Sequence, residues 1–188
     1  MVRRMPEKVG QPCDTIMMEF SAAMKTPGYR AVNPTRQVPA LRHAETGVTE
    51  CGAIIACPAM TFPEAGLLPD DRGDLLRRMF YGAGPLEQAV TTTSLGFEVP
   101  KERRGKVGFG HFDRVPDTLE GLVSAGEYLA GDCLSALDAY LAPQIAWGVR
   151  LGTLPARPGF ADHAARILSR PAAQRASAID DAAMPKQP

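Results

Sequence analysis

The sequence predicts a two-part fold, α/β plus all-α, in which a small mixed domain precedes a helical domain. Residues 1–60 hold short apolar runs between turn signals, and residues 61–70 are dense in Pro and Gly. Residues 71–188 carry apolar side chains at helical spacing. We therefore expect one domain at 1–60, a linker at 61–70 and an all-helical domain at 71–188.

The first thirty residues predict short elements. Residues 1–9 are polar and end in Gly10, which is typical of the tail of a helix, so the chain is expected to start inside an element. The mostly apolar run 13–20 follows a turn signal and predicts a strand. Residues 22–25 predict a short helix that Pro27 and Gly28 end.

A hairpin and a helix complete the predicted α/β domain. Residues 37–42 lead into a second predicted strand, in which Pro39 is confined to the first position because proline has no N–H to give to a β-ladder. A turn at 45–47 and a brief strand at 48–49 would close the hairpin. The apolar run 51–56 predicts a buried helix that Pro58 ends early.

Four helices are expected in the second half, at 71 to about 90, 119–130, 135 to about 150 and 160–168, with a Gly-rich, charged loop at 94–116. The Ser135-x-x-Asp138 spacing predicts a capping box, and Leu134 occupies the position of a hydrophobic staple. Trp147, Tyr140 and Ile145 lie on the third of these helices, where they serve a packed core or a substrate pocket, and core is favoured for most of that face.

Composition excludes several classes of function. The chain has 188 residues, and its 21 Lys and Arg balance its 21 Asp and Glu, so nucleic acid and anionic membrane are disfavoured as partners. No apolar run approaches the roughly 18 residues of a membrane span, and residues 1–6 lack the apolar core of a signal peptide. We expect a cytoplasmic protein.

The cysteines and histidines predict no metal site. The four cysteines lack the C-x-x-C spacing of zinc and redox sites, and the three histidines are scattered. Reduced thiols are therefore expected, and a thiol oxidoreductase using Cys51 or Cys57 is disfavoured. The Gly105-x-x-Gly108-x-Gly110 cluster follows no strand and opens no clear helix, which favours a flexible loop over a phosphate-binding one.

Taken in order, these motifs resemble the glutathione S-transferase superfamily, of bacterial type. The resemblance covers almost the whole chain and is carried by segments 29–34, 37–41 and 50–54, by the Pro-rich linker 63–69, by the capping box, and by Arg170-Pro171-Ala172 with Arg175-Ala176. It implies an incomplete thioredoxin-like domain followed by a glutathione transferase-type helical bundle. It also implies glutathione as co-substrate, a small electrophile as the second substrate, and a homodimer.

The resemblance implies five residues that bind glutathione. The Val38 backbone would pair with the cysteinyl part of glutathione as an added strand, and Pro39 would be cis. Glu50 and Cys51 stand where the family has Glu-Ser at a helix start, a pair that takes the γ-glutamyl group. A thiol is a weaker donor than the usual hydroxyl, so weaker binding is expected. Gln37 is the fifth residue and serves equally well as a surface amide.

Two functions remain open on the sequence. In the family a Ser, Tyr or Cys after the first strand keeps the glutathione sulfur ionised, and this chain is expected to lack that strand and to offer no activating residue. Arg36 stands where relatives often have Gly, and Pro58 shortens the expected helix. The chain is therefore either a glutathione-conjugating enzyme or a non-catalytic member that binds glutathione weakly or not at all.

Overall fold

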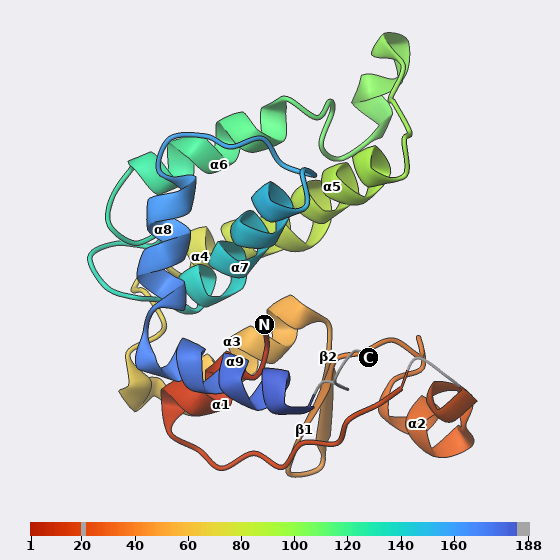
Figure 1. Ribbon diagram of the computed structural model, residues 1–188, viewed down its shortest axis with the longest axis vertical. Helices are drawn as coiled ribbons and strands as arrows, with labels where there is room; N and C mark the ends of the chain where they lie inside the picture. The colour runs from red at the N-terminus through yellow and green to blue at the C-terminus, as the bar shows by residue number, and fades with distance from the viewer. Residues whose placement is uncertain (20–21, 184–188) are drawn as a thin grey trace.

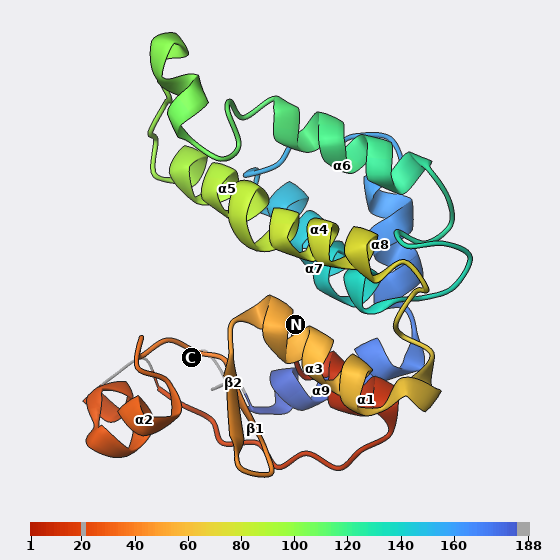
Figure 2. The same ribbon diagram turned by 180° about the vertical axis from the view of Figure 1, so that it is seen from behind.

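The computed structural model describes residues 1–19 and 22–183, and its elements form two groups (Figure 1). The lower group in that view contains a β-hairpin and the chain start, and the upper group is helical. Seen from behind, the last helix again lies beside the first one (Figure 2). The chain therefore leaves the first group for the helical one and returns to it near its end.

The first group begins with helix α1 (Arg4–Val9), which Gly10 ends in the left-handed conformation as the sequence predicts. A 3-10 turn η1 (Ala22–Lys25) and helix α2 (Pro27–Val32) follow. Strands β1 (Ala40–His43) and β2 (Thr46–Thr49) pair antiparallel, with Ala40 opposite Thr49. Helix α3 (Cys51–Thr61) follows the hairpin at once.

The strand predicted at 13–20 is wrong. Residues 13–19 form no strand, and Phe20 lies outside the described residues. Within the described part of the chain, β1 and β2 pair only with each other, so the run has no ladder to join, and Ile16 is 84% exposed. The short helix predicted at 22–25 is confirmed as the 3-10 turn η1, which ends at Lys25. Pro27 then begins α2, since proline lacks the N–H that a first-turn residue leaves unpaired.

Helix α3 is also longer than predicted. Pro58 lies inside it and the helix continues to Thr61, although proline removes one backbone hydrogen bond. Pro58 and its neighbour Ala59 are buried, and α3 contacts α1 and the helix α7 (Ala136–Arg150). Tertiary packing of the buried face therefore outweighs the lost hydrogen bond.

The helical group starts with α4 (Arg72–Tyr81), which passes through a π-helical turn η3 (Gly82–Leu86) into α5 (Glu87–Ser94). A 3-10 turn η4 (Lys101–Lys106) and α6 (Arg114–Ser124) come next. After α7 come α8 (Phe160–Leu168) and α9 (Pro171–Ala183). A short 3-10 turn η2 (Pro63–Ala65) lies in the expected linker, and the boundaries at 60 and 71 remain a prediction.

The predicted helix at 119–130 is displaced. Helix α6 begins at Arg114 and ends at Ser124, so the expected loop 94–116 is shorter at its end and contains η4. Pro116 is compatible with this start, because it stands in the first turn, where no intrahelical N–H bond is needed. The helix predicted at 135–150 is confirmed, with Ser135 as N-cap and the Ser135–Asp138 capping box in place.

The core is centred on α7, whose Leu137, Leu141 and Ile145 are fully buried. Tyr140 is buried as well, which agrees with the core role favoured for that face, whereas Trp147 is 60% exposed. Helix α9 packs against α1, where Arg175 pairs with Glu7 at 2.8 Å and Arg3 pairs with Asp180 at 2.6 Å. Within the described ranges, none of the helices combines the length and apolar character needed to cross a bilayer.

Candidate functional site

A rigid turn precedes the Val38-Pro39 pair. Asn33 is buried, and its side-chain amide donates to the Gln37 carbonyl at 2.8 Å, while the Tyr29 hydroxyl donates to the same carbonyl at 2.7 Å. The Arg36 N–H donates to the Asn33 carbonyl at 3.0 Å. Residues 33–37 are therefore held from several sides, and the backbone enters Val38 in one defined direction.

Val38 and Pro39 lie at the open end of the hairpin. The bond between them is cis, as expected. In the part of the chain that the structure describes, neither the N–H nor the C=O of Val38 has a hydrogen-bond partner. Free backbone groups beside the end of a hairpin can pair with an added peptide strand.

Glu50 and Cys51 lie at the same end of the hairpin. Ala40 pairs with Thr49 at the end of the antiparallel ladder. Pro39 precedes Ala40 and Glu50 follows Thr49, so both lie just beyond this pair. Glu50 is exposed and has φ 67° and ψ 126°, and it makes no side-chain cap on α3. The first-turn amides of α3 therefore have no partner among the described residues, and an uncapped helix start of this kind attracts a carboxylate.

The Cys51 thiol is half-buried at this helix start. Burial raises its pKa above the ordinary value, against the opposing effect of the Met1 amino group. At neutral pH Cys51 is therefore a protonated thiol that can donate a weak hydrogen bond, and it is a poor nucleophile.

Comparison with solved structures identifies the fold. A sphingomonad glutathione S-transferase complexed with glutathione superposes with a TM-score of 0.74 at 23% identity, covering 97% of this chain and 94% of its own. A bacterial beta class glutathione S-transferase from Sphingomonas chungbukensis superposes with a TM-score of 0.75 at 22% identity, covering 95% and 92% of the two chains. This chain has the glutathione S-transferase fold. The predicted combination of a thioredoxin-like part and a helical bundle is thereby confirmed.

Two relatives match part of the sequence. A probable maleylacetoacetate isomerase 2 of Drosophila melanogaster is 32% identical over 123 residues, which are 62% of this chain and 53% of the relative. Glutathione S-transferase 1 of Dianthus caryophyllus is 29% identical over 136 residues, which are 67% and 61%. The chain thus spans less than two thirds of the length of these relatives. No family model matches the sequence.

A small cavity adjoins the hairpin end in this glutathione S-transferase fold. Its volume is about 190 Å³, and most of its lining side chains are apolar. It lies where α5 and α7 face the chain start, close to Cys51, since the charges of Cys51 and the Met1 amino group affect each other's pKa. The lining residues are Met1, Leu86, Glu87, Val90, Pro143, Gln144, Trp147, Gly148, Leu151 and Thr153.

The Tyr140 ring packs against the start of α3. A Cβ atom placed on Gly52 would lie 3.5 Å from the Tyr140 ring, so the two helices α3 and α7 touch at this point. Burial raises the pKa of Tyr140 to about 12, so its phenol stays protonated near neutral pH. Tyr140 is therefore a structural support, and it supplies no phenolate.

The five residues implied by the resemblance thus lie at one end of one hairpin, but the lining of the cavity was largely missed. Of that lining, only Trp147 was singled out from the sequence as a pocket candidate. Leu86, Glu87 and Val90 carry no motif, and only the packing of α5 against α7 reveals them. Among the described residues, no group of His, Cys, Asp or Glu is arranged to hold a metal ion.

Proposed function

We propose that this chain binds glutathione at the hairpin end and joins its sulfur to a small electrophile held in the 190 Å³ cavity. The observation that carries the proposal is the juxtaposition of two unpaired backbone features, the free N–H and C=O of Val38 and the uncapped start of α3. Both lie at the end of the hairpin that adjoins an apolar cavity. Glutathione is a tripeptide, so its backbone can pair with the N–H and C=O of Val38. Its terminal carboxylate can accept hydrogen bonds from the uncapped amides of α3.

The proposed contacts divide glutathione into two parts. Val38 pairs its backbone with the cysteinyl residue, and Pro39 and Gln37 line that segment. The α-carboxylate of the γ-glutamyl group accepts from the first-turn amides of α3 and from the Cys51 thiol. Glu50 is exposed and attracts the amino group of the same residue. A thiol donates more weakly than a hydroxyl, so the proposed affinity is low, in the millimolar range.

In the proposed reaction the glutathione thiolate attacks an electrophilic carbon, and a C–S bond forms while the carbon gives up a leaving group or takes up a proton. Because a free thiol has a pKa near ~8.5, only a minority of the glutathione is ionised at neutral pH. We assign no side chain of this chain to the activation of that sulfur. Two relatives are named for the isomerisation of maleylacetoacetate, so this compound belongs among the electrophiles to be tried.

A second candidate function is non-catalytic binding of glutathione. It is favoured by Arg36, which occupies a left-handed conformation with φ 60°, and by the protonated thiol at position 51. Both are departures from the expected glycine and serine in the turn and at the helix start.

The proposal includes a homodimer in the cytoplasm, with domains at 1–60 and 71–188. Leu76 and Phe80 lie one turn apart on α4 and are exposed, which supports contact with a second copy. The four cysteines are free thiols, which supports a reducing compartment. Light scattering on the purified chain measures the mass directly, and a monomer at micromolar concentration contradicts the dimer.

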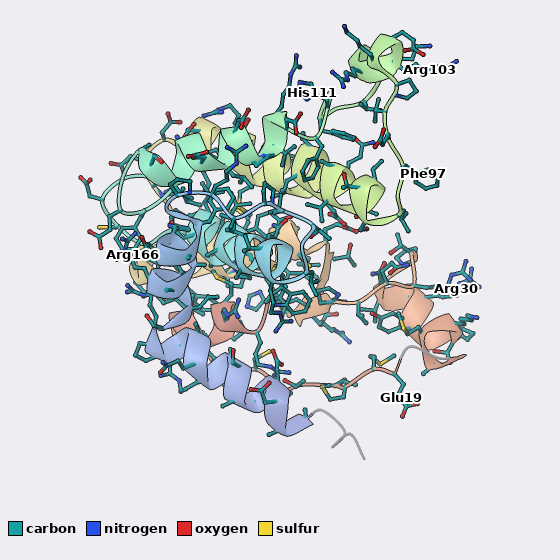
Figure 3. The ribbon with its side chains drawn as sticks, turned by 45° about the horizontal axis from the view of Figure 1, so that its top comes forward. Glu19, Arg30, Phe97, Arg103, His111 and Arg166 are labelled. Carbon is teal, nitrogen blue, oxygen red and sulfur yellow. The ribbon has the colours of Figure 1, made fainter. Side chains whose placement is uncertain are left out.

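A conjugation assay tests the activity. Wild-type chain is mixed with glutathione and 1-chloro-2,4-dinitrobenzene, and the thioether is followed by absorbance. The Trp147→Ala variant is expected to raise the KM for the aryl chloride, because Trp147 lines the cavity. Phe97→Ala is the matched control, since Phe97 is an exposed aromatic side chain that points away from the bundle (Figure 3). If glutathione binds but the rate equals that of the uncatalysed reaction, the conjugating activity is contradicted and the non-catalytic function is favoured.

A further inference from the structure

A second cavity lies away from the hairpin. It has a volume of about 400 Å³ and lies in the helical group, between the end of α4, the turn η4 and the start of α6. Its size falls within the range of about 300–1,000 Å³ that is typical of small-molecule sites. The 190 Å³ cavity beside the hairpin is called the glutathione-side cavity below, and none of its lining residues lines this second cavity.

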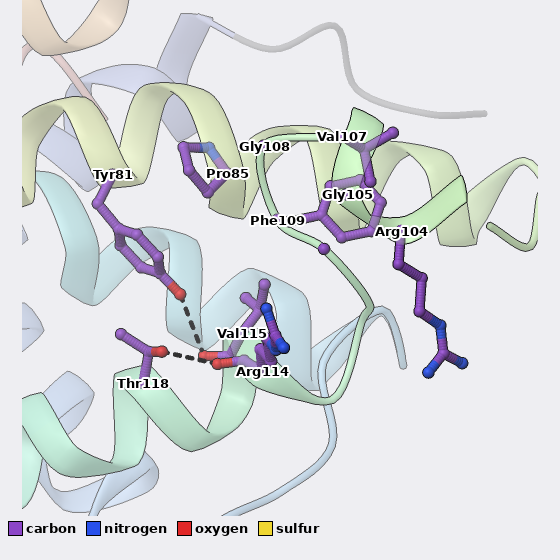
Figure 4. Close-up of a pocket in the computed structure, with 11 residues that line it drawn as sticks. Tyr81, Pro85, Arg104, Gly105, Val107, Gly108, Phe109, Arg114, Val115 and Thr118 are labelled. Atoms are coloured by element: carbon purple, nitrogen blue, oxygen red, sulfur yellow. Dashed lines mark hydrogen bonds between the residues drawn. The ribbon is translucent and has the colours of Figure 1, made fainter. Parts of the chain in front are cut away.

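The walls of this cavity are partly apolar and partly cationic. Figure 4 shows the rings of Tyr81, Pro85 and Phe109 around it. Arg104 on η4 and Arg114 on α6 also line it, and in Figure 4 the Arg114 guanidinium lies beside Val115 whereas the Arg104 guanidinium extends away from the rings. Among the described residues, no lining side chain is acidic, and neither Arg104 nor Arg114 pairs with a carboxylate.

The acids at the start of α6 are engaged elsewhere. Asp117 pairs with Arg157 at 3.0 Å, and Asp113 lies 3.7 Å from the His111 ring. Glu120 is 3.5 Å from Arg157 as well. The two cavity arginines are therefore left with an uncompensated positive charge that a bound anion can neutralise.

The glycine-rich loop of residues 105–110 lies against the Arg114 guanidinium. Gly110 has φ 69°, and a Cβ placed there would lie 2.9 Å from the Arg114 guanidinium. Glycine adopts this backbone conformation without strain, and a side chain at position 110 would move the end of Arg114. The start of α6 is fixed in turn, because the Thr118 hydroxyl donates to the Arg114 carbonyl at 2.7 Å and the Tyr81 hydroxyl donates to the Val115 carbonyl at 3.3 Å (Figure 4).

We infer that this cavity is a binding site for a small aromatic carboxylate, separate from the glutathione site. The ring of the ligand packs against Phe109, Tyr81 and Pro85, its carboxylate accepts hydrogen bonds from Arg114, and Arg104 adds positive charge at the rim. Guanidinium groups are the side chains best suited to bind a planar carboxylate in two places. The loop of residues 105–110 serves as a wall of this site, and no phosphate role is assigned to it.

Calorimetric titration with 2-naphthoate tests the inference, and 2-naphthamide is the uncharged probe of the same shape. We expect 2-naphthoate to bind the wild-type chain and 2-naphthamide to bind about tenfold more weakly or less. The Arg104→Gln/Arg114→Gln variant should lose about tenfold in affinity for 2-naphthoate. Arg103→Gln is the matched control, because Arg103 stands on the same turn, lies outside the lining and points outward (Figure 3). It should change the affinity by less than about twofold.

Further variants separate this site from the glutathione-side cavity. Trp147→Ala alters only the other cavity and should leave 2-naphthoate binding unchanged, whereas Gly110→Ala should weaken it because Arg114 is displaced. Equal binding by the wild type and the double arginine variant overturns the inference. So does a loss of binding in Trp147→Ala, or an equal loss in Arg103→Gln. Circular dichroism of each variant confirms that a loss is not due to unfolding.

Discussion

Replacing Asp138 by alanine should destabilise the whole helical group. Asp138 is fully buried, and its Oδ1 accepts from the Leu129 N–H at 2.8 Å. Its Oδ2 accepts from the Ser135 N–H at 2.8 Å and from the Ser135 hydroxyl at 2.7 Å. One carboxylate therefore joins the start of α7 to the loop that precedes it.

The size of the effect follows from these contacts. A hydrogen bond to a charged group contributes about 1.5–3 kcal/mol, and a buried donor without an acceptor costs about 1–3 kcal/mol. The variant leaves two buried amides, those of Leu129 and Ser135, without an acceptor, whereas the hydroxyl can turn to another partner. The variant also removes the desolvation cost of the buried carboxylate, which offsets part of the loss. We expect a net loss of about 3–5 kcal/mol, which is a large share of the ~5–15 kcal/mol that stabilises a typical domain.

Urea unfolding followed by circular dichroism measures this loss. Asp132→Ala is the matched control, because Asp132 is exposed and lies six residues earlier in the same loop. The control should change the free energy of unfolding by less than about 0.5 kcal/mol. A loss below about 1 kcal/mol in Asp138→Ala, or a loss equal to that of the control, would refute the reasoning.

Three further predictions follow from single residues. Arg36→Gly should raise the free energy of unfolding by about 0.5–1 kcal/mol, because Arg36 has φ 60°, whereas Arg36→Ala keeps the strain and should bring no gain in the same urea titration. Cys51→Ser should tighten glutathione binding about three- to tenfold in calorimetry, because a hydroxyl donates better than a thiol, and unchanged affinity would contradict the proposed contact. Burial lowers the pKa of His163 below 6.5, so the unfolded chain binds protons more readily than the folded one between the two pKa values. The contribution of neutral His163 to the free energy of unfolding should be fully present above pH 6.5 and fall below it by up to about 1.4 kcal/mol per pH unit. Urea titrations from pH 7.5 to 5 measure this slope. The same slope in a His163→Gln variant would contradict His163 as its origin.

Local signals predicted the elements that depend on local chemistry. The capping box at Ser135, the glycine that ends α1 and the proline before β1 each act within a few residues, so their spacing in the sequence is sufficient. The candidate glutathione residues came from the resemblance, lie in two short segments at one hairpin end, and remain a prediction.

Features that depend on distant contacts were not predictable in this way. The apolar run at 13–19 has the composition of a strand, but a strand also needs a neighbour to pair with. Pro58 should end a helix by local rules, and the buried face of α3 keeps the helix intact. Both cavities arise where helices far apart in the sequence meet, so their lining residues follow no motif.

A thermal melt of the chain with and without millimolar glutathione tests the central claim most directly. A ligand that binds only the folded state raises the midpoint, and glutathione at about ten times a millimolar Kd should add about 1.4 kcal/mol, or a few °C. Glu45→Gln, an exposed acid in the hairpin turn, should keep this shift, and Glu50→Gln should lose most of it. An unshifted wild-type midpoint, or an equal shift in Glu50→Gln, would contradict a glutathione site at the hairpin end.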